Sequence, residues 1–146
     1  MPLCLCGLKP IAMEHSHDIR VYYEDTDAGG IVYHADYIKY AERGRTEFLR
    51  ALGLENRVLQ DREGILFVVV HLEADFYKPA HLDDLLTVKT VVSELGNASF
   101  AMNQTIFCGD VRLFGMSVKL ACVDLDKRVT RLTDAVRAAF EQTMGG

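Results

Sequence analysis

The sequence predicts an α+β fold in which a five-stranded antiparallel sheet wraps around one long helix. Only residues 36–52 have the apolar spacing of a long helix. Five other stretches alternate in polarity or are rich in β-branched and aromatic residues, as strands are. Two of their connections are short glycine turns, which join antiparallel neighbours. Because one face of such a sheet must be covered and a single long helix is available, we expect the sheet to curve around that helix.

The first predicted strand covers residues 18–23. Ile19, Val21 and Tyr23 recur at every second position, which is the period of a strand with one buried face.

The long helix follows a polar loop. Asp36 is a candidate N-cap, and Gly53 stands just past the expected helix end near Leu52. The helix carries one apolar stripe, which consists of Tyr37, Tyr40, Ala41, Gly44, Phe48 and Leu52.

Gly44 is the unusual member of this stripe. A glycine inside a helix costs about 1 kcal/mol of stability relative to alanine. Because Gly44 lies on the apolar face, we interpret it as a point where the backbone of the sheet approaches the helix closely. Simple tolerance of the cost is the alternative.

A short helix is predicted just before Gly64, and four strands and a final helix are predicted after it. Strong β-propensity marks the strands, and Thr133 is a candidate cap for a final helix. The predicted short helix covers 55–62, the strands cover 65–77, 85–95, 98–108 and 111–125, and the final helix covers 133–142.

Length and charge limit the classes of protein to consider. The 146 residues fit one domain, which we place at 16–146, after a flexible N-terminal tail at 1–15. The formal net charge of −5 argues against a nucleic-acid binder, whose affinity would rest on a basic surface. A small anionic ligand remains compatible with this charge.

The sequence also indicates a cytoplasmic location. No stretch reaches the roughly 18 apolar residues of a membrane span, and the N-terminus lacks the basic start of a signal peptide. The four cysteines form no C-x-x-C pair or zinc spacing, so we interpret them as reduced thiols.

Polar chemistry is concentrated in the loop before the long helix. Asp25 and Asp27 flank a threonine, and Gly29 and Gly30 follow, where they allow a ligand to approach the backbone. If the helix begins near Asp36, its first N–H groups lie near these carboxylates. A carboxylate beside fixed N–H donors suits acyl transfer, since the carboxylate attacks or activates water and the donors stabilise the oxyanion.

Three other interpretations of this loop stay open at the level of local chemistry. It has part of the pattern of a calcium loop, although its twelfth position is Asp36 rather than glutamate. His15, His17 and His34 could join the aspartates in binding a metal. The loop could also be a structural turn with solvated acids.

The motif of this region resembles that of the hotdog-fold acyl-CoA thioesterases. The similarity is greatest to the 4-hydroxybenzoyl-CoA thioesterase branch, and within it to the Tol–Pal-associated acyl-CoA thioesterases. It extends over about residues 18–125. The motif positions are Asp27, Gly30, Ile31, Val32, Tyr33, His34 and Tyr37.

The resemblance implies roles for several residues. Asp27 would be the catalytic nucleophile or general base, and Asp25 the less favoured carboxylate. The backbone N–H near His34 would face the thioester carbonyl, and the imidazole of His34 would help to orient substrate or water. Gly29, Gly30, Tyr33 and Lys78 complete the expected substrate contacts. Arg128 and Arg131 are further candidates for the CoA phosphates.

The resemblance further implies an enzyme that needs no metal or other cofactor and that forms homodimers or homotetramers, with sheets joined edge to edge. The expected substrate is an acyl-CoA, and acyl carrier protein is a second possible acyl donor. Two other functions of the fold stay open. One is non-hydrolytic binding of acyl-CoA or acyl carrier protein, and the other is hydration or dehydration of an acyl chain.

Overall fold

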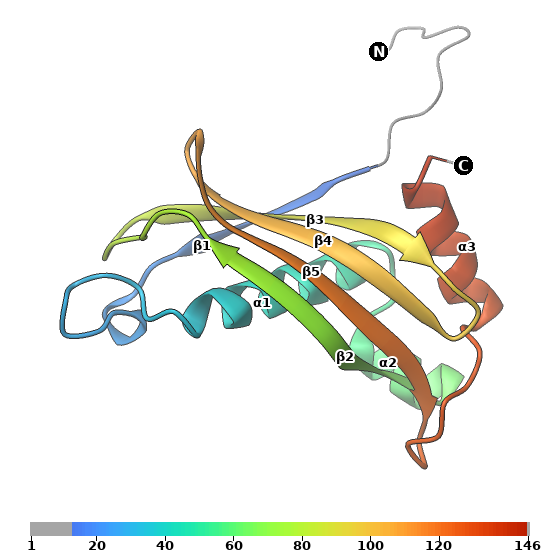
Figure 1. Ribbon diagram of the computed structural model, residues 1–146. Coiled ribbons are helices and arrows are strands. Elements are labelled where there is room, and N and C mark those ends of the chain that lie inside the picture. Colours follow the sequence, from blue (N-terminus) through green and yellow to red (C-terminus); the bar gives the residue numbers. More distant parts are fainter. Residues whose placement is uncertain (1–12, 146) are drawn as a thin grey trace, which may run out of the picture.

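A computed structural model describes residues 13–145 as one curved antiparallel sheet with helix α1 along one face (Figure 1). The strand order is β1-β3-β4-β5-β2, so β1 and β2 form the two edges. The strands are β1 (His15–Arg20), β2 (Ile65–Phe76), β3 (Leu85–Leu95), β4 (Ser99–Cys108) and β5 (Val111–Asp124). The helices are α1 (Asp36–Ala51), α2 (Asn56–Val58) and α3 (Asp134–Thr143). The predicted α+β architecture is confirmed.

The two predicted glycine turns form β-hairpins. Leu95 of β3 pairs with Phe100 of β4, and Cys108 of β4 pairs with Val111 of β5. Strand β2 does not lie beside β3, its neighbour in sequence, but pairs with β5 at the far edge. The connection between β2 and β3 therefore crosses the end of the sheet.

The first strand was predicted too late in the sequence. It begins at His15, which pairs with Thr90, and it ends at Arg20. It stops there because the Tyr23–Asp25 segment folds into a 3₁₀ turn, whose start is held by the Tyr22 N–H donating to Asp25 Oδ2 at 2.9 Å. The folded domain therefore includes His15, the last residue of the predicted tail at 1–15. Residues 1–12 of that tail lie outside the described part.

Helix α1 begins and ends close to the predicted positions. The N-cap is Ala35, not Asp36, and Asp36 is the first helical residue, its N–H donating to Tyr33 O at 2.9 Å. Gly53 follows the helix with a φ of 76°, as expected for a C-terminal glycine. The predicted stripe is buried except for Leu52, which is partly covered.

Gly44 marks the predicted close approach between α1 and the sheet. A Cβ placed on Gly44 would lie 2.5 Å from Val88 Cγ1 and 3.4 Å from Thr90 Oγ1. The crowding atoms are side-chain atoms of β3 rather than its backbone. Any larger residue at position 44 would therefore push the helix away from the sheet.

The C-terminal elements close the core at the end of the sheet away from the polar loop (Figure 1). Thr133 caps α3 by accepting a hydrogen bond from the Val136 N–H, as predicted. Phe140 of α3 stacks on Phe48 of α1, with ring centroids 6.4 Å apart. A π-helical turn (Leu59–Glu63) extends α2, so the predicted short helix at 55–62 is confirmed.

The Gly44 contact predicts a specific energetic coupling. Gly44→Ala should lower the free energy of unfolding by about 1–2 kcal/mol, because overpacking against Val88 outweighs the gain in helix propensity. In a Val88→Ala background the same change should be neutral or stabilising by up to ~1 kcal/mol. Urea unfolding of the four proteins measures the coupling, and an equal effect in both backgrounds would show that the contact is not the reason for the glycine.

Candidate active site

The loop between β1 and α1 makes a tight turn that presents Asp27 at its tip. The Asp27 N–H donates to Ile31 O at 2.9 Å, and the Gly30 N–H donates to Asp27 O at 3.0 Å. Gly30 has a φ of 81°, which glycine adopts without strain. Thr26 pairs with Val32 at the base of the turn. These bonds fix the position of Asp27 by local backbone geometry.

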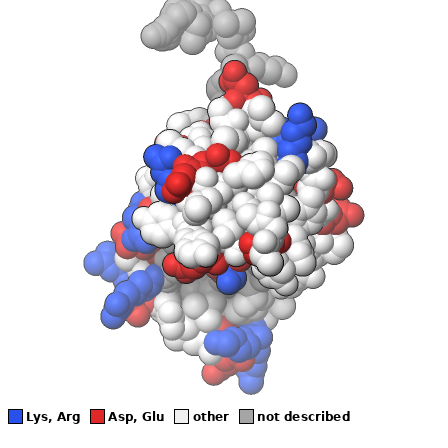
Figure 2. Space-filling view, turned by 90° about the vertical axis from the view of Figure 1, so that its left-hand side faces the viewer, with Lys and Arg blue, Asp and Glu red and all other residues white. Residues whose placement is uncertain are grey.

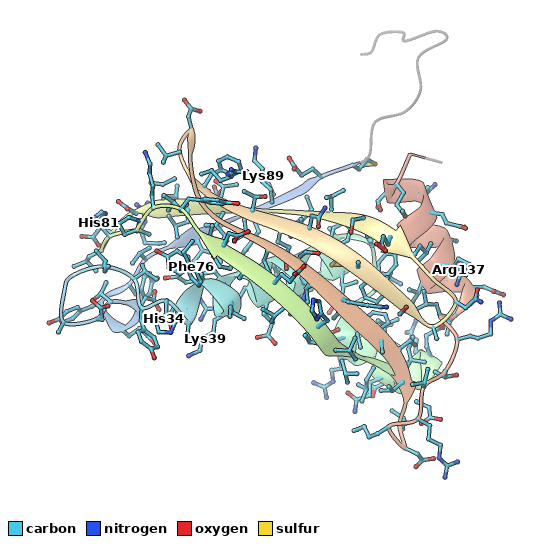
Figure 3. The ribbon with its side chains drawn as sticks, in the orientation of Figure 1. His34, Lys39, Phe76, His81, Lys89 and Arg137 are labelled. Carbon is cyan, nitrogen blue, oxygen red and sulfur yellow. The ribbon has the colours of Figure 1, made fainter. Side chains whose placement is uncertain are left out.

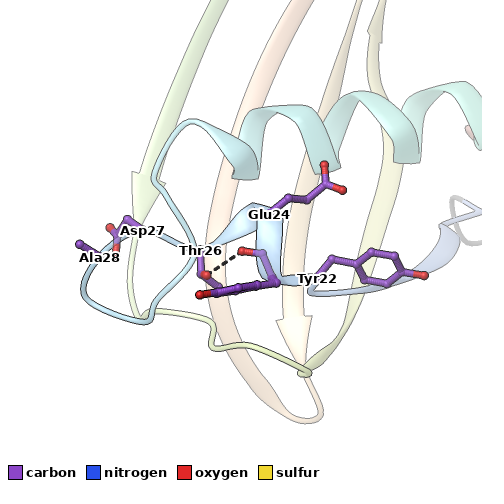
Figure 4. Close-up of a pocket in the computed structure, with 6 residues that line it drawn as sticks. Tyr22, Glu24, Thr26, Asp27 and Ala28 are labelled. Carbon is purple, nitrogen blue, oxygen red and sulfur yellow. Dashed lines mark hydrogen bonds between the residues drawn. The ribbon is translucent and has the colours of Figure 1, made fainter.

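The Asp27 carboxylate is exposed and oriented. Its Oδ1 atom accepts a hydrogen bond from the Gly29 N–H at 2.8 Å. A Cβ on residue 29 would lie only 3.3 Å from that oxygen, so glycine gives the amide room to approach. Within the described part of the chain, no protein group donates to Oδ2. Figure 4 shows Asp27 and Ala28 at the tip of the loop, beside an open hollow lined by Tyr22 and Thr26.

Asp25 has a different environment from Asp27. It is partly buried, and its carboxylate accepts the Tyr22 N–H. Its backbone carbonyl accepts the Tyr33 N–H at 2.9 Å. Asp25 therefore holds the loop together, while the Asp27 carboxylate faces solvent.

A second set of bonds ties the loop to the connection between β2 and β3. The Val32 N–H donates to Ala80 O at 2.9 Å, and the Ala80 N–H donates to the Tyr37 hydroxyl at 2.9 Å. Ile31 also pairs with His81. The start of α1 and the Asp27 loop are thus fixed to the same connection, mainly through the buried Ala80.

A groove of about 250 Å³ lies between the start of α1 and the end of β2. His34 lines it, with its ring 4.5 Å from the Tyr33 ring and 6.4 Å from the Phe76 ring, as ring centroids (Figure 3). Its other lining residues are Ile31, Val32, Tyr37, Tyr77, Lys78 and Pro79. Its walls are largely apolar, as binding grooves for small molecules usually are.

The segment just before α1 supplies an N–H donor at this groove. The His34 N–H has no hydrogen-bond acceptor within residues 13–145, and it lies at the positive end of the helix. Such a group is suited to stabilise a developing oxyanion.

The predicted site residues fall into two neighbouring groups. Gly29 and Gly30 lie beside Asp27, whereas His34 and Lys78 line the groove. Tyr33 does not line the groove itself but packs its ring against that of His34. Ile31 joins the groups, since its carbonyl binds the Asp27 amide and it also lines the groove. Asp27 lines the open hollow beside the loop, whereas His34 lines the groove.

The two arginines considered for phosphate binding lie elsewhere in the described chain. Arg128 and Arg131 follow β5, whose end at Asp124 pairs with Ile65. The groove is at the opposite end of these strands, where Phe76 pairs with Phe114. Within one protomer these arginines therefore do not reach the groove.

An acidic cluster lies beneath the loop. Burial raises the pKa of Asp36 above its ordinary value, Lys39 opposes the shift, and the nearby Asp25 carboxylate adds to it. Burial together with the nearby Asp25 carboxylate raises the pKa of the Tyr40 hydroxyl. Asp36 and Tyr40 are therefore harder to ionise beside the Asp25 carboxylate.

Sequence reasoning missed two residues that shape the site. The Tyr37 hydroxyl holds the Ala80 amide, and Phe76 forms a wall of the groove. Tyr37 was identified only as a motif and stripe residue. The sequence did contain a signal for this role, because Tyr37 places a hydroxyl on the buried face of the helix and a buried tyrosine hydroxyl usually has a hydrogen-bond partner.

The described residues include no group of three or more histidine, cysteine, aspartate and glutamate side chains placed to hold a metal. No helix among them has both the length and the apolar character needed to cross a membrane. The end of the molecule that carries the loop is mostly covered by uncharged side chains (Figure 2).

Comparison with known proteins confirms the resemblance read from the motif. The profile of the Thioesterase superfamily matches residues 29–114, a range that includes His34 and begins two residues after Asp27. The chain is 45% identical to the acyl-CoA thioesterase YbgC of Haemophilus influenzae, over 86% of this chain and 93% of that protein. It is 39% identical to the acyl-CoA thioester hydrolase YbgC of Escherichia coli, over 85% of this chain and 93% of that protein.

Solved structures confirm the hotdog fold. The crystal structure of a probable thioesterase from Bartonella henselae superposes with a TM-score of 0.80 and 43% identity. The superposition covers 82% of this chain and 99% of that one.

The raised pKa of Asp36 predicts how stability depends on pH. The folded protein holds this proton more tightly than the unfolded chain, so the wild type loses stability as pH rises from 3.8 towards the raised pKa. Asp36→Asn removes this loss. The free energy of unfolding of the variant minus that of the wild type should therefore rise across this interval and level off above it. Urea titrations from about pH 3 to about pH 8 measure the difference, and a difference that falls or stays constant would contradict the assignment.

Proposed function

This chain belongs to the Thioesterase superfamily, and on that premise we propose that it is an acyl-CoA thioester hydrolase with Asp27 as the reacting carboxylate. The products are a free carboxylic acid and CoA. One observation carries the proposal: Asp27 is an exposed carboxylate, fixed by the Gly29 N–H, next to a groove at the start of a helix. The named thioesterases similar to this chain over most of its length support it.

Asp27 has two possible roles in the reaction. As a nucleophile it attacks the thioester carbonyl, the C–S bond breaks, CoA leaves as the thiolate, and water then hydrolyses the acyl-aspartyl anhydride. As a general base it takes a proton from water, which attacks the same carbon. In both cases the carbonyl oxygen becomes negative, and the free N–H at His34 is the donor that we assign to it.

The groove supplies positions for the rest of the substrate. Phe76 holds the acyl group near the thioester against an apolar wall, with Tyr33 beside it through its contact with His34, and the His34 imidazole orients the carbonyl or the water. Lys78 lines the same groove and is the candidate contact for a CoA phosphate. No metal or other cofactor takes part in these steps.

We further propose a homodimer joined through the edges of β2. This strand presents several exposed apolar side chains at the sheet edge: Val68, Val69, Val70 and Leu72. A long apolar edge strand favours association unless it is covered. Pairing across a two-fold axis covers it and lets the Asp27 loop of one protomer meet the groove of its partner.

A reducing location agrees with the thiols that the structure describes. Cys108 and Cys122 are free, whereas Cys4 and Cys6 lie outside the described residues. We therefore propose a cytoplasmic enzyme. Acyl-CoA is the proposed acyl donor, and acyl carrier protein is the alternative one.

The main test replaces the reacting carboxylate. Asp27→Asn should keep the fold and lower kcat by about 10²- to 10⁴-fold, the usual contribution of a general base. Release of free thiol from a panel of acyl-CoA substrates measures turnover, and circular dichroism checks the fold. Binding without release by the wild type would instead indicate a non-hydrolytic acyl-CoA protein, and water addition to an enoyl-CoA would indicate a hydratase.

Asp25→Asn is the matched control, since it changes a carboxylate two residues away. It should lower kcat less than Asp27→Asn but reduce the free energy of unfolding, because Asp25 Oδ2 holds the Tyr22 N–H. The opposite ranking of the two kcat values would show that Asp25 is the reacting group.

The proposed dimer can be tested at the middle of β2. Val70 is 56% exposed and lies near the centre of the strand, so two lysines would meet close to the two-fold axis in Val70→Lys. This variant should be a monomer by light scattering, whereas Val129→Lys, at an exposed valine outside β2, should match the wild type. Dimers of unchanged stability in Val70→Lys would place the interface elsewhere.

A further inference from the structure

Arg45 is a buried cation in the middle of α1. The residue is 9% exposed, and its Nη1 atom donates to Gln104 Oε1 at 3.0 Å. Within residues 13–145 no carboxylate lies within salt-bridge distance of its guanidinium. Burial lowers its pKa, and only Glu42 on the same helix opposes this shift. A buried charge without a counter-charge is costly, which suggests that something else supplies the acceptor.

The other hydrogen bonds of Gln104 determine that its side-chain oxygen, and not its nitrogen, faces Arg45. Its Nε2 atom donates to Ala41 O at 2.7 Å and to Thr90 Oγ1 at 3.0 Å. Both donors of the amide are therefore used, and its oxygen must face Arg45. A guanidinium has five N–H donors, so this network leaves donors of Arg45 for another group.

Arg45 lines a partly open cavity of about 110 Å³ between α1 and the sheet. Apolar side chains form most of its wall, and Glu42, Thr46 and Asn56 lie at its polar side. The apolar wall residues are Leu49, Phe67, Val69, Phe100, Met102 and Leu120. At about 30 Å³ for each water, the cavity has room for a group of about three or four waters.

The cavity and the groove at His34 both lie along the seam between α1 and β2, that is, where this helix faces this strand. Tyr37 of α1 and Phe76 of β2 line the groove. Arg45 of α1 and Val69 of β2 line the cavity. Tyr37 and Arg45 are about 12 Å apart along the helix axis, at a rise of about 1.5 Å per residue. An extended chain advances about 1.2 Å per bond, so about ten bonds span this distance.

We propose that the Arg45 cavity binds the far end of the acyl group and that this end carries a carboxylate. The proposal rests on the proposed thioesterase function, since it identifies the class of acyl group that the same seam accepts. A carboxylate pairs with a guanidinium through two parallel hydrogen bonds and supplies the missing counter-charge. An alkyl end would leave the donors of Arg45 unpaired, so the site should discriminate against it.

The test compares substrates that differ only at the far end. Octanedioyl-CoA and decanedioyl-CoA are paired with octanoyl-CoA and decanoyl-CoA. The wild type should favour the carboxylated member by about 10- to 100-fold in kcat/KM, the value of a hydrogen bond to a charged group. Arg45→Met should reduce this ratio to about one while it still hydrolyses the alkyl substrates. Because each ratio is taken within one protein, partial unfolding of a variant does not affect it.

Arg43→Met is the matched control, because Arg43 lies on the same helix but is exposed. It should keep the ratio of the wild type. A wild type without preference, or a preference that survives in Arg45→Met, would overturn the proposal and leave Arg45 as a structural partner of Gln104. Calorimetric binding of the same four compounds to Asp27→Asn gives the comparison without turnover. A carboxylate preference in binding without hydrolysis by the wild type would refute the proposed reaction alone.

Discussion

The close contact between α1 and β3 at Gly44 determines where the candidate site can form. With no side chain at position 44, the helix rests directly on Val88, and its first turn reaches the connection between β2 and β3. There the Tyr37 hydroxyl holds Ala80, and Ala80 in turn holds the loop through Val32. A contact more than two helical turns from the loop thus positions the reacting groups. This explains why the apolar stripe of the helix accepts a residue of poor helix propensity.

Within the loop, two aspartates of similar sequence context do different work. Asp25 uses its carboxylate and its carbonyl to hold backbone amides. Asp27 uses one oxygen for the Gly29 amide and leaves the other free. The arrangement fixes the orientation of the Asp27 carboxylate, as a preorganised site requires. In the reaction that we propose, the free amide of His34 at the neighbouring groove is the donor to the carbonyl oxygen.

The sequence predicted the features that follow from local periodicity and failed where long-range contacts decide. Helix α1, the four later strands and their hairpins follow from spacing and glycine turns. The end of β1 was predicted too late because the Asp25 side chain helps to start a 3₁₀ turn that alternation does not reveal. The place of β2 at the far edge depends on pairing with β5, some 45 residues later, which no local pattern encodes. Local chemistry also left Asp25 and Asp27 equivalent, and only the family motif separated them. Burial of Arg45 escaped notice, although it lies four residues after Ala41 on the apolar stripe.

The most direct test of the reacting role of Asp27 is a crystal structure with a bound acyl-CoA analogue in which a methylene group separates the carbonyl from the CoA sulfur. Such a ketone cannot be hydrolysed but keeps the carbonyl. We expect an Asp27 oxygen about 3–3.5 Å from the carbonyl carbon and a His34 N–H, from either protomer, about 3 Å from the carbonyl oxygen. A carbonyl bound against Asp25, or at a position that Asp27 cannot reach, would contradict the account.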